Sequence, residues 1–353
     1  MTFNGNPPGR LGRASAALAT VLVGVVGLSG CAPERAPAPT PTETYVSTYE
    51  TPPPTELAPL RGTTVPAGSL DHASIAAKID NHWDARPQVG LERTDVLFEE
   101  LVEGGITRYV AIWQSDIPER LGPVRSIRPM DPAIVSPFRG IICYSGGQQR
   151  FVYLMRQTPV YNAIHGQPDT ADTFYRADGR PGPHDVIVKA REVLAQHTDL
   201  AAPQQQFAYS LDAASSTAAK EGKPTAAVEY RFSSLFYGTW KWNAEAERWM
   251  RVQQGKADKD SHGDQLNAAN VVVLRVNVVD DRGVPKTILT GSGEAWVSSG
   301  GATVHGKWSK GGEKDPLRLV DGNGVTIRLA AGNTWFELIP PGGSVGFVPS
   351  TKR

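Results

Sequence analysis

The chain has 353 residues, of which 40% are hydrophobic and 20% charged, enough apolar sequence for large buried cores. Lys and Arg together number 36, the same as Asp and Glu together. This balance argues against a nucleic-acid-binding protein, which normally carries an excess of basic residues.

The N-terminus is typical of a bacterial export signal. Arg10 and Arg13 form a positively charged segment, and the apolar run at 14–28 is too short to span a membrane comfortably. The sequence Leu-Ser-Gly-Cys ending at Cys31 is similar to a lipobox, in which the cysteine receives a diacylglyceryl group. Residues 1–30 are therefore predicted to be a lipoprotein signal peptide, and Cys31 is predicted to anchor an extracytoplasmic protein to the bacterial cell membrane. An ordinary signal peptide cut near Gly30 is the alternative.

Cysteine usage limits the chemistry further. If Cys31 carries a lipid, Cys143 is the one other cysteine and no intrachain disulfide can form. Cys143 lies in an apolar run, which favours a buried thiol over a nucleophile. The chain has no His-Glu-x-x-His motif and no cysteine pair, so neither a metal nor a cofactor is expected.

The remaining chain divides by composition. Residues 31–66 are rich in Pro, Thr and Ala and are predicted to be an unfolded tether, because they cannot bury enough apolar surface to fold. A mixed α/β domain is expected at 67–210 and a mostly antiparallel β domain at 226–353. The overall fold class is then α+β.

A β-hairpin is the main prediction for the first domain. Two runs rich in β-branched and aromatic residues, 95–103 and 106–113, flank Gly104-Gly105. A helix over 94–103 that stops at the glycines is the alternative. In the hairpin, Arg108 lies at the end of an apolar face, where a guanidinium needs a carboxylate or a ligand.

The other elements expected in this domain are a strand at 73–79, a turn at 86–90, a short helix at 130–138 that Asp131 caps, a strand at 140–144, a helix at 148–157 and a helix from Asp185 to about His197. Ser145-Gly146-Gly147 separates the second strand from a helix. Such an arrangement can present backbone N–H groups to an anion, but it is also a common tight turn.

From residue 226 onward, short alternating runs between turn residues predict a β sandwich or a small barrel. The expected strands are 228–232, 238–243, 248–252, 270–279, 286–290, 293–298, 302–308, 316–319, 324–329 and 334–339. Six tryptophans lie here: Trp240, Trp242, Trp249, Trp296, Trp308 and Trp335. They are expected to fill the core, although a stacking surface for a glycan is an alternative.

Several motifs resemble the YerB family of bacterial lipoproteins, a family without an assigned reaction. They are Ile79 to Asn81, Ala85 to Gln88, Glu103 to Arg108, Gly122 to Pro129, Pro183-His184, Trp249 to Arg251, Gly291 to Gly293 and Gly306 to Lys310. The resemblance covers most of residues 70–345 in the same order. It implies a two-part fold of mixed α and β elements and a lipid-anchored, extracytoplasmic location.

Polar residues of this central stretch make up the candidate site: Asp80, Asn81, Arg86, Glu99, Glu103, Arg108, Arg125, Ser126, Arg128 and His184, with Asp95 and Arg176 as further members of the charged set. Arginines suit bidentate binding of phosphate or carboxylate. In one reading these residues bind an anionic envelope polymer, a lipid-linked precursor or a partner protein. In the other, they form an internal ion network that holds loops together.

The function that we expect is non-catalytic binding or scaffolding in the cell envelope. The alternative is a hydrolase or transferase acting on an anionic glycan or lipid-linked precursor. Ser126 would be its nucleophile and His184 its base, or Glu99 and Glu103 would act as an acid/base pair. Ser126 itself does not stand in a Gly-x-Ser-x-Gly motif.

The lipid anchor gives the first testable prediction. A Cys31→Ser variant removes the thiol that would carry the lipid, so the protein should leave the membrane fraction and lose the mass of the acyl groups. Cell fractionation and mass spectrometry measure both. Retention of the variant in the membrane would contradict the lipoprotein assignment.

Overall fold

The computed structural model describes residues 48–351. The signal peptide, Cys31 and the part of the tether before residue 48 lie outside the described residues. Within the described part, no helix has both the length and the apolar character needed to cross a membrane. The described residues from Pro52 onward form one compact unit, and the following account concerns this unit.

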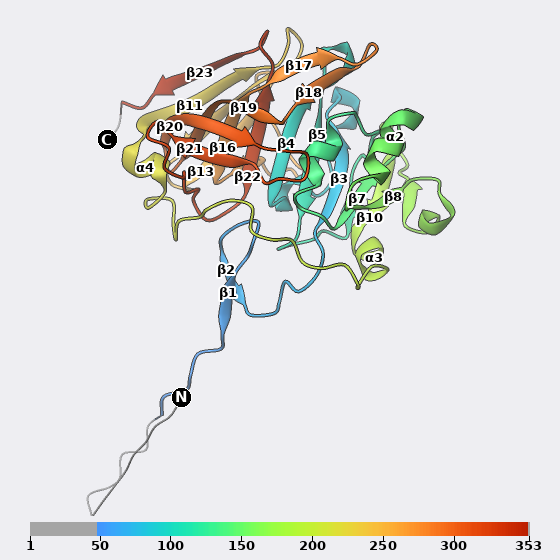
Figure 1. The fold of residues 1–353 in the computed structure, drawn as a ribbon, viewed down its shortest axis with the longest axis horizontal. Helices are drawn as coiled ribbons and strands as arrows, with labels where there is room; N and C mark the ends of the chain where they lie inside the picture. Colours follow the sequence, from blue (N-terminus) through green and yellow to red (C-terminus); the bar gives the residue numbers. More distant parts are fainter. Residues whose placement is uncertain (1–47, 352–353) are drawn as a thin grey trace, which may run out of the picture. The chain divides into compact units, whose positions relative to one another are not determined.

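Strands dominate the fold (Figure 1). The first half contains β1 (Thr55–Leu57), β2 (Thr64–Pro66), β3 (Ile75–Asp80), β4 (Val96–Leu101), β5 (Thr107–Trp113), β6 (Arg120–Leu121), β7 (Ile141–Tyr144), β8 (Tyr161–Ile164), β9 (Phe174–Arg176) and β10 (Val186–Lys189). The second half contains β11 (Lys223–Arg231), β12 (Tyr237–Asn243), β13 (Arg248–Gln253), β14 (Lys256–Ala257), β15 (Asn267–Ala268), β16 (Asn270–Arg275), β17 (Asn277–Asp280), β18 (Pro285–Ile288), β19 (Gly291–Ser299), β20 (Ala302–Lys310), β21 (Arg318–Asp321), β22 (Thr334–Ile339) and β23 (Ser344–Pro349). The α-helices are short: α1 (Asp131–Val135), α2 (Gln149–Arg156), α3 (Ala190–Ala195) and α4 (Thr217–Glu221).

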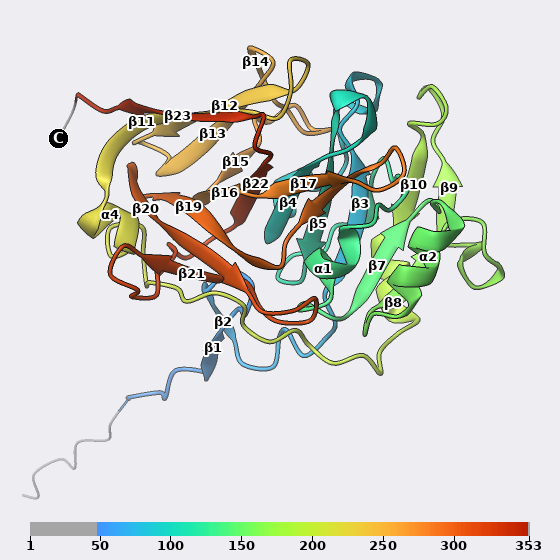
Figure 2. The same ribbon diagram turned by 45° about the horizontal axis from the view of Figure 1, so that its top comes forward.

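Two layers of strands share the long strand β11. Its first two residues pair with β20. From Thr225 onward it pairs with β23, with an irregularity between Thr225 and Ala227, and from Ala227 it also pairs with β12. One layer therefore contains β11 to β15 and β23. The other runs β20-β19-β16-β22-β4-β5-β3-β7-β8, from the second half of the chain into the first (Figure 2).

Strand β22 joins the two halves of the chain. It lies between β16 and β4 and is parallel to both. Its register places Phe336 beside Phe98, and the two rings stack at a centroid distance of 4.6 Å. Phe207, from the segment that connects the halves, lies 5.2 Å from Phe336. One apolar cluster therefore contains residues from both halves and from their connection.

Aromatic rings fill the space between the two layers. Trp240 of β12 and Trp335 of β22 meet edge to face with centroids 5.0 Å apart. These two, Trp249 and Trp308 are each at most 2% exposed, whereas Trp242 and Trp296 are partly buried against the same core. The four buried tryptophans are therefore core residues, as expected from burial of large rings in a β domain.

Arg251 is a fully buried cation at the centre of this aromatic core. Its guanidinium donates to Glu99 at 2.7 Å, to Asp258 at 2.8 Å and to Glu337 at 3.1 Å. The Trp335 ring lies 4.7 Å from the guanidinium carbon, within cation–π range. Because Glu99 is on β4 and Arg251 on β13, the ion cluster also joins the halves of the chain.

Two of these carboxyl groups are direct neighbours. Glu337 and Glu99 are opposite each other in the parallel pairing of β22 with β4. Burial, and next the Glu99 charge, raises the pKa of Glu337 well above its usual value. Glu337 also accepts a bond from the Trp240 indole at 2.8 Å. This environment favours the protonated form of Glu337 in the folded protein.

The hairpin prediction is confirmed, because β4 and β5 pair antiparallel around the Gly104-Gly105 turn. The alternative helix over 94–103 is wrong. Val96, Phe98 and the intervening residues are buried on both faces of the sheet, which suits a strand between two layers.

Three local predictions are wrong. The predicted tether ends earlier than residue 66, because β1 and β2 form a hairpin; its turn buries Leu60, whose carbonyl accepts a bond from the Tyr209 hydroxyl. The segment after Asp185, expected to be helical as far as about His197, first forms the buried strand β10, and its helical part is α3. Residues 324–329 form isolated bridges rather than a strand, and β23 was not predicted at all. Edge partners and loop packing, which are non-local, decide these segments.

Asp131 likewise does not cap α1. It is the first residue of that helix, after Met130, and its buried carboxylate accepts bonds from the Lys78 ammonium at 2.7 Å and the Arg128 backbone N–H at 2.6 Å.

The joining role of Phe336 can be tested by Phe336→Ala. Removing this fully buried ring should cost about 3–5 kcal/mol of unfolding free energy, and both halves should still unfold in one transition. Urea titration followed by tryptophan fluorescence and circular dichroism measures both. The control Phe347→Ala, on edge strand β23 and half-buried, should cost less. Two separated transitions for the native protein would contradict the proposed joint core.

The protonated state of Glu337 predicts a pH effect. With a folded pKa above the unfolded one, the native state binds more protons, so stability falls as pH rises from the unfolded pKa of about 4.5 through the folded pKa. Glu337→Gln removes this pH-dependent contribution to the unfolding free energy, because glutamine does not ionise. The variant should therefore equal or exceed the native protein in stability at neutral pH, with a smaller fall from acid to neutral pH. Urea titrations across that range test this, with the exposed Glu245→Gln as control. Parallel curves for Glu337→Gln and the native protein would contradict it.

Candidate functional site

The alternation of β3, β4 and β5 divides the candidate residues between two faces of the sheet. Asp80, Glu100 and Arg108 occupy matching positions on neighbouring strands and project to the face that α1 covers. Asn81 and Glu99 project to the opposite face, toward Arg251. The predicted site residues are therefore not one group, because consecutive residues of a strand point in opposite directions.

The group on the Arg251 side is tightly bonded within the protein. The Asn81 side-chain amide donates to Glu99 at 3.1 Å and its carbonyl oxygen accepts from Arg86 at 3.2 Å. Arg86 also donates to Gln254 at 2.9 Å. Asn81 and Glu99 are at most 1% exposed. These contacts match the internal-network reading for this group.

Asp95 and Arg176 lie apart from both groups. Asp95 is buried and accepts bonds from the backbone N–H groups of Gln114 and Ser115, with Arg61 at 3.4 Å. Arg176 pairs with Asp185 at 2.7 Å.

The opposite face holds an arginine cluster of Arg108, Arg125 and Arg128. Arg125 lies 3.1 Å from the buried carboxylate of Asp80, and Arg128 donates to Glu103 at 2.7 Å. The side chains of Arg125 and Arg128 are 19% and 12% exposed, so both reach the surface in part. Two of the three arginines are thus in ion pairs.

Arg108 has no such partner. It is 5% exposed, and no carboxylate among the described residues lies within 4.0 Å of its guanidinium. Its Nη1 donates to the Ser126 carbonyl at 2.8 Å, while its buried Nε has no hydrogen-bond partner. Burial, then the charges of Arg128 and Arg125, lowers the pKa of Arg108 to about 10, so it remains a cation at neutral pH.

The carboxylates nearest in register to Arg108 are bound to other cations. Glu100 contacts the buried ammonium of Lys78, which also donates to Asp131 at 2.7 Å. Asp80 is bound by Arg125 and His184. Arg108 is therefore a buried cation beside carboxylates that are already neutralised.

His184 lies at the edge of this cluster. Its Nδ1 is 2.6 Å from Asp80 Oδ2, and because a carboxylate only accepts, the imidazole Nδ1–H donates. Such a pair fixes a histidine ring in place and can orient a general base. The Ser126 hydroxyl makes no hydrogen bond to His184 in the described part of the chain; Ser126 contributes its carbonyl oxygen, to Arg108 and Arg128.

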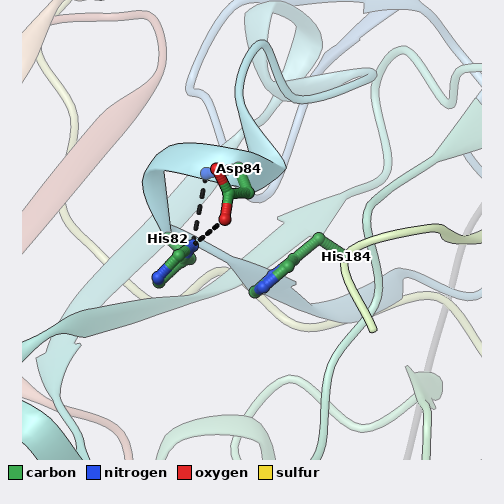
Figure 3. Close-up of side chains that lie close together, drawn as sticks. All are labelled: His82, Asp84 and His184. Atoms are coloured by element: carbon green, nitrogen blue, oxygen red, sulfur yellow. Dashed lines mark hydrogen bonds and ion pairs between the residues drawn. The ribbon is translucent and has the colours of Figure 1, made fainter. Parts of the chain in front are cut away.

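A second histidine stacks on His184. The His82 ring lies 4.5 Å from it with an interplanar angle of 11°, and Asp84 lies on the same short turn as His82 (Figure 3). The Nδ1 of His82 accepts the Asp84 backbone N–H at 3.2 Å and lies 3.4 Å from the Asp84 carboxylate. Burial, followed by the neighbouring His184, lowers the pKa of His82. This group joins the arginine cluster through Asp80.

The glycine turn after β7 supports the loop that carries two of the arginines. The Ser145 N–H donates to the Arg125 carbonyl, and the Gly146 carbonyl accepts the Ile127 N–H. Ile127 fills the space where a side chain at Gly147 would be, 3.1 Å away. These contacts match a tight structural turn.

An open cleft borders the first group. It has a volume of about 730 Å³ and is lined by Trp83, Arg86 and the loop 256–263. The half-exposed Trp83 forms one wall, next to His82 in sequence.

Sequence reasoning missed His82, Asp84, Arg251 and Glu337. The period-two burial of Trp249, Arg251 and Gln253 on β13 was the signal for a buried arginine, because that period places Arg251 on the same face as a large apolar ring. The pairing of His82 with His184 joins residues about a hundred positions apart, and no local pattern predicts it.

Comparison with known proteins identifies the family. Residues 60–203 match the model described as "Protein of unknown function (DUF3048) N-terminal domain", and residues 228–336 match the corresponding C-terminal domain. A curated protein of Bacillus subtilis, named "Putative lipoprotein YerB", is 25% identical over 305 residues, which is 80% of this chain and 86% of that protein.

A solved structure has the same fold. The crystal structure of the YerB protein from Bacillus subtilis superimposes with a TM-score of 0.71 at 21% sequence identity, covering 82% of this chain and 99% of that one. The expected resemblance is thus confirmed by sequence and by fold, and this chain belongs to the YerB-like family of DUF3048 proteins.

Proposed function

We propose that this chain is a lipid-anchored, extracytoplasmic protein of the bacterial cell envelope that binds an anionic ligand without catalysing a reaction. The lipobox-like sequence ending at Cys31 supports the location, and so does the name of the YerB relative, which describes that protein as a lipoprotein. The ligand would be a phosphate- or carboxylate-bearing envelope polymer, a lipid-linked precursor, or an acidic surface of a partner protein.

The unpaired charge of Arg108 is the observation that carries the proposal. A buried guanidinium without a carboxylate costs free energy, because burial removes its hydration. Arg125 and Arg128 add positive charge nearby and lower the pKa of Arg108. An anion placed among the three arginines would relieve this repulsion and accept bidentate hydrogen bonds.

Simple charge counting does not predict this arrangement. The region holds four cations (Lys78, Arg108, Arg125 and Arg128) and four carboxylates (Asp80, Glu100, Glu103 and Asp131). The carboxylates are unevenly placed, because two of them contact Lys78. Two carboxylates around one ammonium leave an excess of negative charge near Lys78, beneath α1. The excess of positive charge lies at Arg108.

Two matched variants test the role of Arg108. Arg108→Met removes an unpaired buried cation, so the unfolding free energy without ligand should stay the same or rise. Arg125→Met leaves the buried Asp80 without its arginine, and should lose up to about 3 kcal/mol. Thermal and urea unfolding of the apo proteins measures the difference.

Binding is measured with inorganic phosphate and a polyglycerol phosphate polymer as probes. The native protein should gain thermal stability with either probe, and Arg108→Met should gain none; the exposed variant Arg93→Gln, whose arginine pairs with Asp116, is the control. A large loss of apo stability in Arg108→Met would assign Arg108 to the structural network. If phosphate or the polymer stabilises Arg108→Met as much as the native protein, the anion binds at a site that does not include Arg108.

The Asp80–His184 pair favours one alternative, a hydrolase or transferase acting on an anionic glycan or lipid-linked precursor. In that case His184 would be the general base, held in orientation by Asp80. Product release from envelope extracts that disappears in His184→Gln would favour this activity over simple binding.

A further inference from the structure

His82, Asp84 and His184 form a cluster of metal-binding side chains at the surface. One ligand atom from each residue lies within 4.8 Å of the others. The side chains, drawn in Figure 3, are 19%, 49% and 13% exposed, so solvent reaches the cluster. We propose that these three residues bind one divalent transition-metal ion such as Zn²⁺.

The donor set fits this class of ion. Two imidazoles and one carboxylate are ligands that Zn²⁺ accepts, and three protein ligands leave a fourth position open to water or another ligand. Hard ions such as Mg²⁺ and Ca²⁺ prefer sites made of oxygen atoms alone. Two histidines beside one carboxylate therefore favour a late first-row metal.

Asp80 provides the second, independent observation. A metal-binding histidine usually donates its other ring N–H to a carboxylate, which fixes its tautomer and orientation. Asp80 is 1% exposed and accepts the Nδ1–H of His184 at 2.6 Å. This bond leaves the Nε2 lone pair of His184 free to bind an ion. Asp80 also receives the backbone N–H of His82 at 3.0 Å, so it supports both histidines.

Metal binding requires a turn of one ring. The two imidazoles are nearly parallel, so their in-plane lone pairs do not meet at one point. His184 is fixed by Asp80, whereas the His82 ring accepts one hydrogen bond, the 3.2 Å bond from the Asp84 backbone. We therefore expect His82 to rotate and to break its stacking on His184 when the ion binds.

A second cluster, Glu92, Asp260 and His262, serves as an internal control. Asp260 Oδ1 already accepts the backbone N–H groups of His262 and Asp264, at 2.7 and 3.0 Å. The His262 side chain is 71% exposed, and its one ion-pair contact is with Glu92 at 3.9 Å. Among the described residues, no buried carboxylate is therefore bonded to the His262 ring in the way that Asp80 is bonded to the His184 ring.

The metal site does not depend on the proposed anion binding. It uses different side chains, and Zn²⁺ binding can be measured without any anionic ligand. Asp80 links the two sites, because it contacts both His184 and Arg125.

The experiment uses the full chain, purified and treated with a chelator. Calorimetric titration with Zn²⁺ should show one saturable site, and Co²⁺ should give the visible absorption of a low-coordinate nitrogen and oxygen site. His82→Ala and His184→Ala should each weaken Zn²⁺ binding at least tenfold, and Asp80→Asn about 10–100-fold. His262→Ala should bind like the native protein.

Apo melting curves of each variant show first that it folds. His82→Ala is the decisive variant, because its ring bonds to no buried carboxylate and its loss should leave the fold intact. Weakened binding in folded His82→Ala with normal binding in His262→Ala supports the site. Three outcomes would overturn the proposed site. They are no saturable Zn²⁺ binding by the native protein, normal Zn²⁺ binding by His82→Ala, and loss of Zn²⁺ binding in His262→Ala.

Discussion

The buried charge of Arg251 is the constraint on which the rest of the structure depends. A guanidinium with no exposed surface is tolerable only when carboxylates compensate it. Its three partners come from β4, from β22 and from the loop after β14. Since β4 belongs to the first half of the chain, the contacts of Arg251 span both halves. The two family domains therefore share one interior.

The strands β4 and β5 place neighbouring residues on opposite faces of the sheet, and the two faces differ in how their charges are paired. On β4, Glu99 points into the aromatic core and Glu100 points to Lys78 beneath α1. On β5, Tyr109 lies against Arg251, and Arg108 lies on the face of the arginine cluster. A period of two thus separates the Arg251 network, in which three carboxyl groups contact the guanidinium, from the face where Arg108 has no carboxylate partner among the described residues. The second face is where ligand binding is worth testing.

Asp80 connects the two proposed sites. It is buried at the end of β3 and receives Arg125, His184 and the backbone N–H of His82. A cation held by the histidines and an anion held by the arginines would lie on either side of this carboxylate. Their charges are opposite, so occupancy of one site would favour occupancy of the other.

The sequence by itself determined the features that local chemistry controls. It predicted the β4–β5 hairpin from its glycine turn, the strands β3 and β7, the helix α2 and the burial of four of the six tryptophans in the second half. It also indicated that Arg108, at the end of an apolar strand face, needs a partner. Alternation and turn chemistry act over a few residues, so they can be read directly from the order of side chains.

Only the tertiary structure decided what depends on contacts between distant residues. The insertion of β22 between β16 and β4, the meeting of Arg251 with Glu99, and the stacking of His82 on His184 all join segments far apart in the chain. Ion-pair partners are likewise non-local. Arg125 pairs with Asp80 and Arg128 with Glu103, whereas Arg108 has no carboxylate partner among the described residues. Strand order and burial choose among partners that are equivalent in sequence, so composition alone could not distinguish a ligand site from an internal network.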